Sequence, residues 1–478
     1  MSKVLLIFPP YTKQEPAENE KSVDELKREA SDAWLTVMAQ KYGKDSVYCN
    51  ILPTDQMSMS MGILSLSSYL KKDGIDVSYI HCDYFLDEKK FDWHELLEFI
   101  AQESKSADIC GFYSTTNNII KILEIARYVK QTCPNITNII GGPHATFCDI
   151  EILSENSFID YVVRGEGEET LYEIVKSIGQ NNENNNLIPG ATYRKNGEIV
   201  RAPDRQQIDY TAIPSVDFDI LPKDYKFNLL TMYSRGCPFS CNFCAEGGLW
   251  GSKVRFRDPN IVAEELKMIN EQNSQQIIHL ADSEIDAFPE KFDLLLDAIE
   301  SKNLNCQFSV NIRPDSFKRM NKERLRRMKR LGFSVFFIGV ESASDEVLKA
   351  MNRRTTFSDF LNTIKLINEC EEDFVILPYV MLGFPGETEV TLQQTVNAFI
   401  KLLDEGKIDY LFPKIFIPYP GCDVFSNPEK YNVKISTDYD QYARYSLIPP
   451  FEDPNLSNDL RGEYLSLFYS RIIKSLNS

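Results

Sequence analysis

The sequence predicts an α/β protein with two consecutive α/β domains and a small C-terminal segment. Short apolar runs alternate with amphipathic stretches along most of the 478 residues, a pattern typical of parallel sheets. A polar, asparagine-rich run at residues 181–186 interrupts this alternation and reads as a linker. We expect residues 1–180 to form the first domain and residues 181–226 a linker with a hairpin. Residues 227–420 should form a barrel-like domain, and residues 421–478 a C-terminal helical segment.

The first domain holds five strand candidates separated by helical stretches. They are Val4–Phe8, Val77–Ile80, Asp108–Tyr113, Ile136–Ile140 and Tyr161–Val163. This order predicts a Rossmann-like or flavodoxin-like sheet, which binds ligands beyond the carboxyl ends of its strands.

Two segments stand outside this alternation. An insertion at about residues 13–58 carries an apolar stripe at helical spacing over residues 21–42, and we expect either a lid over the ligand crevice or a helix that patches the surface. After the linker, Ala191–Arg194 and Glu198–Arg201 flank an Asn-Gly pair, which favours a hairpin turn.

The second domain repeats the strand–helix unit six times. Its strand candidates are Leu229–Tyr233, Ile277–Ala281, Gln307–Asn311, Val335–Val340, Val375–Leu382 and Tyr410–Ile417. Six such units predict a barrel-like parallel sheet, whose chemistry lies at the carboxyl ends of the strands. A final helix is expected over residues 464–476.

Composition excludes several classes of protein. The net charge of −18 disfavours nucleic acid as a partner, because such binding depends on Lys and Arg. The longest apolar stretch, Phe374–Phe384, contains a proline and is shorter than the ~20 residues of a membrane span, so we expect no membrane contact. Eleven cysteines without a paired framework indicate the reducing cytoplasm.

Three of these cysteines form the most informative motif. Cys237, Cys241 and Cys244 follow the first strand of the second domain directly. Three thiolates at this spacing suit three corners of an iron–sulfur cube, because Cys is the usual ligand of such clusters. Without a fourth Cys nearby, one iron stays open to an exchangeable ligand. A structural zinc site would need four ligands, and a disulfide fits poorly with an odd number of cysteines.

The cysteine spacing resembles the C-x3-C-x2-C signature of the radical S-adenosylmethionine (SAM) enzymes. This resemblance implies a 4Fe–4S cluster whose open iron is chelated by SAM, and reductive cleavage of SAM to a 5′-deoxyadenosyl radical. It also implies an external electron donor, such as a flavodoxin or ferredoxin, and a partial (βα)6 barrel over residues 227–420.

The same resemblance implies SAM contacts in the cysteine loop and at the strand ends. The candidates are Phe243, Asp282, Glu284, Arg313, Glu341 and Leu382. Phe243 and Leu382 would meet the adenine, Glu341 the ribose or methionine, and Arg313 could pair with a carboxylate. The chain lacks a Gly-Gly-Glu motif after the second strand, so either Asp282 or Glu284 could take the amino group. Each candidate could instead be a cap or turn residue.

Loops at the strand ends of the first domain resemble the cobalamin-binding domain fused to many radical SAM enzymes. The candidates are Ser114, Thr115, Gly141, Gly142, Pro143, His144, Gly165 and Gly167. Glycines there permit close approach to a bulky ligand, although tight loop packing would also select them. The Asp-x-His-x-x-Gly loop that gives cobalt a histidine is missing after the first strand. The resemblance therefore implies cobalamin without that ligand, and His144 is either an alternative imidazole or a turn residue.

Together, the resemblances imply a cobalamin-dependent radical SAM methyltransferase. Its target would be an unactivated carbon or phosphinate centre of a small-molecule or peptide natural product. A cyclase, rearrangement or oxidation enzyme with the same domains is the alternative, and no catalytic residue can be assigned. A methylthiotransferase would use Cys49, Cys82 and Cys110 for a second cluster, but Cys110 lies inside a predicted strand. A non-catalytic iron–sulfur sensor would need a fully ligated cluster.

Overall fold

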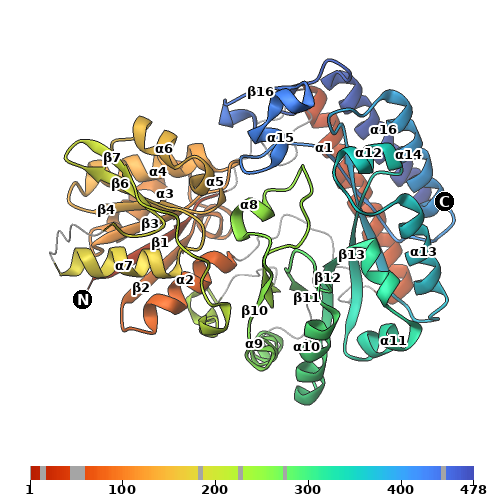
Figure 1. Cartoon of the computed structure of the whole chain (residues 1–478), viewed down its shortest axis with the longest axis horizontal. Helices are drawn as coiled ribbons and strands as arrows, with labels where there is room; N and C mark the ends of the chain where they lie inside the picture. The colour runs from red at the N-terminus through yellow and green to blue at the C-terminus, as the bar shows by residue number, and fades with distance from the viewer. Residues whose placement is uncertain are drawn as a thin grey trace. The chain divides into compact units, whose positions relative to one another are not determined.

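The computed structural model divides the chain into two compact units (Figure 1). It describes residues 2–10, 18–43, 60–180, 187–223, 230–272, 277–442 and 448–478. The first unit is drawn from residues 1–13, 59–227 and 248–250, and the second from residues 14–58, 228–247 and 251–478. The α/β fold class is confirmed. The asparagine-rich run at residues 181–186 and Cys49 lie outside the described residues.

A seven-stranded sheet forms the first unit, in the order β2-β1-β3-β4-β5-β6-β7. Its strands are β1 (Lys3–Phe8), β2 (Asp76–His81), β3 (Ile109–Tyr113), β4 (Thr137–Gly141), β5 (Tyr161–Val163), β6 (Ala191–Lys195) and β7 (Glu198–Arg201). The five predicted parallel strands are confirmed, each to within one residue. Val4 pairs with Val77 on one side and with Ile109 on the other, so β1 is a central strand. Its apolar run is buried because helices cover both faces of the sheet.

The helices of this unit follow the predicted alternation. They are α2 (Met61–Lys71), α3 (Trp93–Ser104), α4 (Ile119–Thr132), α5 (Pro143–Phe147), α6 (Asp149–Glu155) and α7 (Glu168–Gly179). α3 begins with a capping box in which Asp92 and Glu95 each bond to the other's backbone N–H. Their connections place the loops after β3, β4 and β5 at one edge of the sheet.

The hairpin expected within a linker is part of the first sheet. β6 pairs antiparallel with β5, and β7 with β6. Asn196 and Gly197 have φ angles of 52° and 84°, as the predicted Asn-Gly turn requires. The hairpin belongs to the sheet because its strands pair with β5, whose backbone groups would otherwise lie unpaired at the sheet edge.

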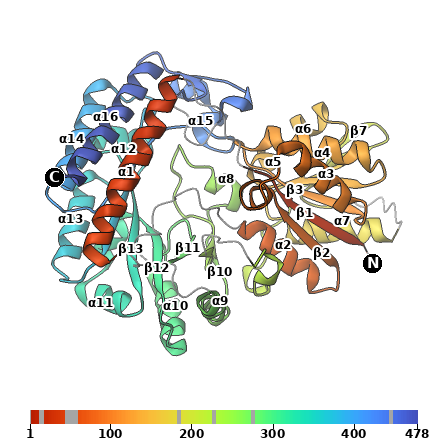
Figure 2. The same cartoon turned by 180° about the vertical axis from the view of Figure 1, so that it is seen from behind.

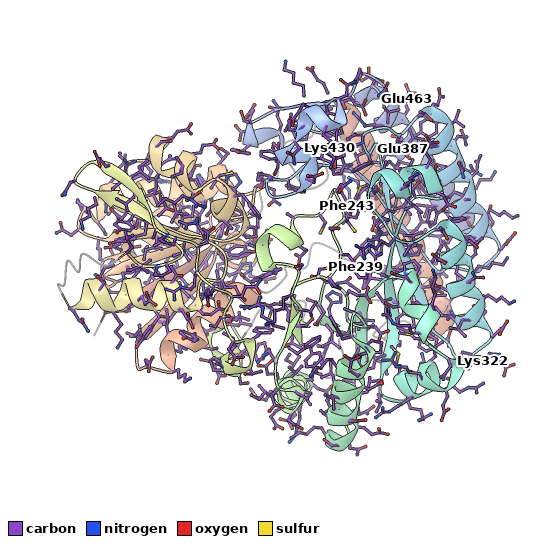
Figure 3. The ribbon with its side chains drawn as sticks, in the orientation of Figure 1. Phe239, Phe243, Lys322, Glu387, Lys430 and Glu463 are labelled. Carbon is purple, nitrogen blue, oxygen red and sulfur yellow. The ribbon has the colours of Figure 1, made fainter. Side chains whose placement is uncertain are left out.

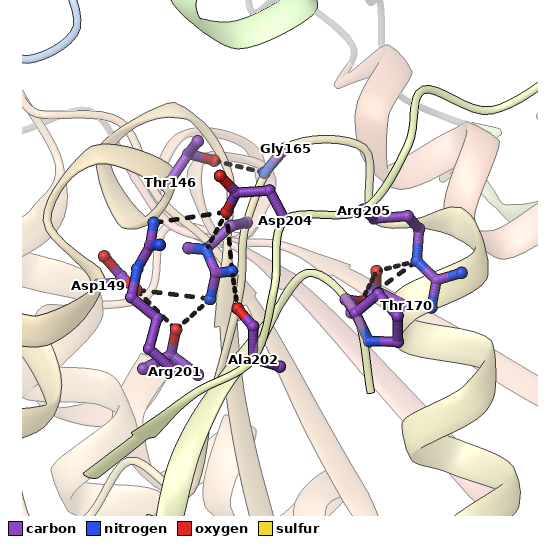
Figure 4. A network of polar contacts seen from close by, with 11 residues as sticks. Thr146, Asp149, Gly165, Thr170, Arg201, Ala202, Asp204 and Arg205 are labelled. Atoms are coloured by element: carbon purple, nitrogen blue, oxygen red, sulfur yellow. Dashed lines mark hydrogen bonds and ion pairs between the residues drawn. The ribbon is translucent and has the colours of Figure 1, made fainter. Parts of the chain in front are cut away.

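A partly buried polar network holds the hairpin to the sheet (Figure 4). Arg164, directly after β5, donates to the hydroxyl of Thr192 and, through Nη2, to Asp204 Oδ1 at 2.9 Å. Thr192 Oγ1 donates to Asp149 Oδ2 at 2.6 Å, and Arg201 Nε donates to the same oxygen at 2.8 Å. The side chain of Arg164 is therefore used for the fold, while the next residues are left to form the strand-end loop.

Six parallel strands form the second unit, in the order β15-β14-β13-β12-β11-β8, and we call this curved sheet the half-barrel (Figure 1). They are β8 (Leu230–Thr231), β11 (Ile277–Leu280), β12 (Gln307–Ile312), β13 (Phe333–Glu341), β14 (Val375–Leu382) and β15 (Phe412–Ile415). All six predicted strands are confirmed, with β8 and β15 shorter than expected. The chain after β8 continues into β9 (Ser234–Arg235), which pairs antiparallel with β10 (Arg255–Phe256).

Helices cover the outer face of the half-barrel. They are α9 (Pro259–Gln272), α10 (Pro289–Lys302), α11 (Lys322–Arg330), α12 (Asp345–Ala350), α13 (Phe357–Asn368) and α14 (Glu389–Asp404). On the inner side of the sheet, one residue near the end of each of five strands is partly exposed: His279, Asn311, Gly339, Met381 and Lys414. The residue that follows each of them in the chain points to the other side and is buried. The period-two exposure indicates that the inner side of the sheet is open.

The helix predicted as a lid or patch of the first domain packs in the second unit instead. α1 (Glu18–Tyr42) runs along α16 (Asn458–Leu476) (Figure 2). Trp34 is fully buried in this interface, with its ring 5.4 Å from that of Tyr410. The apolar stripe of α1 is buried against α16 and against Tyr410, which precedes β15. The first sheet is already covered by its own helices.

The C-terminal segment is mixed rather than helical throughout. It contains α15 (Asp423–Ser426), β16 (Lys434–Ile435), β17 (Phe451–Glu452) and α16, which begins six residues before the predicted helix. In the described part of the chain, no helix is long and apolar enough to cross a membrane.

Candidate functional site

The cysteine loop lies between β9 and α8 (Glu246–Trp250) and is held by backbone bonds at several points. The N–H of Cys237 donates to Gly251 O at 3.4 Å, and the N–H of Asn242 donates to Met351 O at 3.0 Å. Gly236, with a φ of 101°, leads into the loop, and a Cβ there would lie 2.5 Å from Lys253 O. Only glycine allows this close approach, so the start of the loop is fixed by its backbone.

All three predicted cluster ligands lie half-buried in this loop with free thiols. Burial raises the pKa of the Cys237 thiol and raises that of Cys244 to about 12, and both thiols also sense the charge of the other cysteines. Among the described residues, no group of three or more His, Cys, Asp and Glu side chains is placed so that it could hold a single metal ion. A 4Fe–4S cluster binds each thiolate to a different iron, so three neighbouring thiols on one loop fit it as donors.

Two buried arginines converge on Cys241. Arg313, after β12, and Arg353, after α12, each place Nη1 3.7 Å from Cys241 Sγ. Arg313 was predicted as a site residue, whereas Arg353 was missed. It follows a short helix rather than a strand, and no sequence motif marks it. The fold alone brings it to the cysteines.

Two aromatic rings of the loop, Phe239 and Phe243 (labelled in Figure 3), lie against the same two arginines. The Arg313 guanidinium carbon lies 3.7 Å from the centroid of the Phe239 ring, and that of Arg353 lies 5.9 Å from the ring of Phe243. Phe243 also packs against an apolar cluster that includes Phe384. The predicted adenine contact, Phe243, is therefore partly buried beside a cation.

The structure shows that Asp282 and Glu284, the two candidate carboxylates after the second strand, have different surroundings. Asp282 is fully buried and accepts hydrogen bonds from the N–H of Tyr233 at 3.0 Å, the N–H of Ser234 at 2.6 Å and the hydroxyl of Ser234. Burial raises its pKa to about 6 against these hydrogen bonds. Both oxygens of Asp282 thus hold the chain that leads into the cysteine loop.

Glu284 is the freer carboxylate. Oε1 accepts from Ser316 Oγ at 2.8 Å, while Oε2 has no hydrogen-bond partner among the described residues. Burial raises its pKa to about 7, and the nearby charge of Arg313 opposes this shift. Its charge also influences the Cys237 thiol, so Glu284 lies close to the cysteine loop. A buried, half-paired carboxyl group of this kind suits a cationic ligand group.

Glu341 ends β13 in a strained conformation. Its φ is 73°, in the left-handed region, and the register of β13 and β14 shifts at this point. Its Oε1 lies 3.6 Å from Arg353 Nη2, and burial raises its pKa. A non-glycine residue in this region costs about 1–2 kcal/mol, and such strain concentrates at ligand sites.

The loop after β14 is fixed by the C-terminal segment. The N–H of Gly383 donates to Glu387 Oε2 at 2.5 Å, and a Cβ at Gly383 would lie 2.5 Å from Arg461 Nε of α16. Burial raises the pKa of Glu387, labelled in Figure 3, to about 8. The predicted contact Leu382 is buried, and its carbonyl accepts from the N–H of Phe416 at 2.9 Å. Its side chain is therefore part of the core.

In the first unit, Ser114 joins the loops after β3 and β4. Its hydroxyl donates to Gly141 O at 2.9 Å and accepts from the N–H of Ala145 at 3.2 Å. Gly142 has a φ of 102°, and a Cβ there would lie 2.5 Å from Ser114 O. Ser114 and Gly142 are thus required by loop packing itself, as the alternative interpretation of these glycines expected.

The imidazole of His144 is occupied within the fold. His144 follows Pro143 in the first turn of α5 and is buried, with Nδ1 3.2 Å from Thr116 Oγ1. Burial lowers its pKa to about 4, so the ring is neutral. Thr115 is likewise engaged, through Asn117 and Asn118. The structure therefore favours a structural role for His144 over a metal ligand.

The loop after β5 has open space at Gly165. Gly165 has a φ of 65°, and a Cβ there would meet no atom within 4 Å. Its N–H donates to Thr146 Oγ1 at 3.0 Å, which ties the loops after β4 and β5 together (Figure 4). At Gly167 a Cβ would lie 3.1 Å from Leu66, and at Gly141 it would make only ordinary contacts.

Comparisons with known proteins match both units. The radical SAM superfamily model matches residues 231–399, and the B12 binding domain model matches residues 54–175. An uncharacterized methyltransferase from Pyrococcus horikoshii is 30% identical over 379 residues, which cover 76% of this chain and 79% of the relative. The anaerobic magnesium-protoporphyrin IX monomethyl ester cyclase of Cereibacter sphaeroides is 27% identical over 84% of this chain, but the match covers only 64% of the cyclase.

A solved structure has the same fold. The radical SAM methyltransferase TsrM from Kitasatospora setae, with cobalamin and a 4Fe–4S cluster bound, aligns over 88% of this chain and 74% of its own with a TM-score of 0.67 at 16% identity. The chain belongs to the radical SAM superfamily, in the group whose members carry a B12-binding domain, and its cofactors are a 4Fe–4S cluster, SAM and cobalamin.

Proposed function

We propose that this protein is a methyltransferase for an unactivated carbon or phosphinate centre of a small molecule or peptide. The observation that carries the proposal is the half-paired set of charges around the cysteine loop, in a chain that also has a B12-binding domain. When bound, the cofactors would supply one-electron cleavage of SAM and a transferable methyl group. The relative from Pyrococcus horikoshii, which is named as an uncharacterized methyltransferase, supports this reaction.

Each residue has a separate task in this proposal. Cys237, Cys241 and Cys244 ligate three irons, which leaves the fourth for SAM. Glu284 accepts the amino group of SAM through its unpaired oxygen, because a buried carboxylate gains most from a cationic partner.

Glu341, Phe243 and Arg313 complete the proposed SAM site. Glu341 would contact the ribose or methionine, Phe243 the adenine, and Arg313 a carboxylate. Asp282 positions the loop and does not touch SAM. The loop carrying Leu382 would contribute backbone groups only.

In the first unit, we propose that the loops around Gly141, Gly142, Gly165 and Gly167 accept the corrin ring by shape. Ser114 and Pro143 fix these loops, Thr115 borders them, and His144 does not bind cobalt. An external flavodoxin or ferredoxin would supply the electron. The reducing cytoplasm suits the ten described cysteines, all of which are free.

Anaerobic reconstitution with iron, sulfide and hydroxocobalamin tests the proposal. With SAM and a reductant, we expect the protein to retain corrinoid and to form both 5′-deoxyadenosine and S-adenosylhomocysteine. Cys241→Ala should abolish both products together with the visible absorption of the cluster. Cys133→Ala, which removes a half-buried thiol of the first unit, is the matched control and should change neither.

Two results would contradict the methyltransferase. Product formation without any bound corrinoid would remove the role of the first unit. Formation of 5′-deoxyadenosine without S-adenosylhomocysteine, in the presence of the true substrate, would favour a cyclase, rearrangement or oxidation enzyme, for which the cyclase relative is the precedent. For a methylthiotransferase, Cys110 is poorly placed as a ligand of a second cluster, because it is buried inside β3 and bonded to Ser104.

A further inference from the structure

We infer that Arg353 is a positioning residue of the cluster, which bonds to the Cys241 thiolate and makes the cluster easier to reduce. The inference rests on the proposed function, since it takes Cys241 as a cluster ligand. It goes beyond that function by assigning a redox role to a residue outside the cysteine motif.

The first argument is geometric. Arg353 Nη1 lies 3.7 Å from Cys241 Sγ, and Nη2 donates to Gly339 O at the end of β13. One planar guanidinium thus connects the half-barrel to the cysteine loop. Because the two nitrogens are fixed relative to each other, the bond to Gly339 aims the other nitrogen at the sulfur.

The second argument is burial. The Arg353 side chain is only 6% exposed, and its Nε has no hydrogen-bond partner among the described residues. A buried and incompletely paired guanidinium is costly in a folded protein unless it serves a negative ligand. A thiolate-ligated cluster supplies such a charge.

The third argument separates Arg353 from Arg313, which approaches the same sulfur. Arg313 is neutralised by Asp315, with Nε 2.9 Å from Oδ1 and Nη2 3.5 Å from Oδ2. Among the described residues, Arg353 forms an ion pair with Glu341, at the longer distance of 3.6 Å between Nη2 and Oε1. The charge of Arg353 is therefore less compensated, and its effect on the cluster should be larger.

Reduction adds one electron to the cluster and so makes it more negative. A positive charge and an N–H donor at a cluster sulfur stabilise the reduced form more than the oxidised form, because hydrogen bonds to the sulfurs and local charge set the potential. Removal of Arg353 should therefore lower the reduction potential.

A redox titration followed by electron paramagnetic resonance tests this directly. The reconstituted full chain is titrated with dithionite and mediators in the absence of SAM, so that any effect on SAM binding does not enter. We expect Arg353→Gln to lower the ratio of reduced to oxidised cluster at a fixed potential by about tenfold, which is 59 mV for one electron. Iron content and the cluster signal are measured on each sample.

Arg354→Gln is the matched control. It removes the same charge one residue further along, from an exposed side chain, and should leave the potential unchanged. Arg353→Lys is the second variant. Its ammonium keeps the charge but cannot bond to Gly339 and Cys241 as a planar fork does, so a smaller shift in the same direction is expected.

The outcomes are distinct. A wild-type protein that binds no cluster overturns the proposed function and this inference together. A cluster with the same potential in the wild type and in Arg353→Gln overturns this inference alone. If Arg353→Gln holds no cluster, the reduction potential of Arg353→Lys is the test. A wild-type potential in Arg353→Lys then overturns the inference. An equal shift in Arg354→Gln would show a non-specific charge effect and would also overturn it.

Discussion

Ser114 in the first unit and Glu284 in the second, both in strand-end loops, use their polar groups in opposite ways. In the first unit, Ser114, Gly141 and Ala145 bond to one another, and Gly142 fits against Ser114 with no room for a side chain. In the second unit, Glu284 keeps a buried oxygen without a described partner, and Arg353 keeps a buried nitrogen in the same state.

This difference indicates two ways of binding a cofactor. Loops whose polar groups are already paired offer shape and backbone to a large ligand, and they can be rigid without it. Loops that hold buried, half-paired charges are stabilised by a ligand that completes them. The first arrangement suits a corrin ring, and the second suits a cluster and a zwitterionic molecule such as SAM.

The largest expected effect tests the self-paired loops of the first unit. Gly142→Ala should destabilise the protein by about 4 kcal/mol, since it combines a backbone region nearly closed to other residues with an overlap on Ser114 O. Chemical denaturation measures this. Gly165→Ala should cost only about 1 kcal/mol, because its left-handed φ is strained but the space is open.

The corrinoid content of these two variants sharpens the comparison. We expect Gly165→Ala to retain less corrinoid despite its stability, because its added methyl group would point into the open space of the loop after β5. Equal stability of the two variants would show that the packing around Ser114 is not rigid.

The next effect separates the two carboxylates of the second unit. Asp282→Asn should cost about 3 kcal/mol of unfolding free energy, because an amide cannot accept all of the bonds from Tyr233 and Ser234. Glu284→Gln should change stability by less than about 1 kcal/mol and weaken SAM binding at least about tenfold. Equilibrium dialysis with SAM measures the second quantity. The reverse assignment would follow if Asp282→Asn were stable and failed to bind SAM.

An effect that appears only as the pH rises is expected at Glu387. Its pKa is about 8 in the folded chain and 4.5 ordinarily, so the stability gained from the retained proton is full below pH 4.5 and is lost as the pH rises through 8. Glu387→Gln lacks this loss. Its stability relative to the wild type should therefore rise by up to about 4 kcal/mol between pH 5 and pH 8.5. Denaturation at both pH values measures it, and a difference that does not change with pH would contradict it.

The smallest expected effect is at His144. Its ring is buried, neutral and bonded to Thr116, so His144→Asn should leave the absorption spectrum of bound cobalamin unchanged from pH 5 to pH 8. A shift of that spectrum on substitution would show that the imidazole reaches cobalt and would break the contrast between the two units.

Much of the fold could be predicted because hydrophobic periodicity records it directly. The runs that became β1 and β4 are buried on both faces over most of their length, and such strands read as continuous apolar segments. The cysteine motif could be predicted because its three ligands are local in sequence. Ser114 and Gly142 were identified correctly as loop residues, but sequence could not distinguish packing from ligand contact.

Other features depend on contacts between distant segments. α1 has an apolar stripe that predicts a helix but does not name its partner, and the partner is α16, more than 400 residues later. The hairpin of β6 and β7 carries a clear turn signal, yet only the antiparallel pairing with β5 makes it part of the first sheet.

The sequence by itself determined the α/β class, the succession of strands along the chain and the three-cysteine motif, because these depend on local periodicity and spacing. The tertiary structure decided that Asp282 holds the loop while Glu284 remains half-paired, and that Arg353 meets Cys241. Those roles depend on which atoms fold against each side chain, and a residue's type and position in the chain do not contain that information.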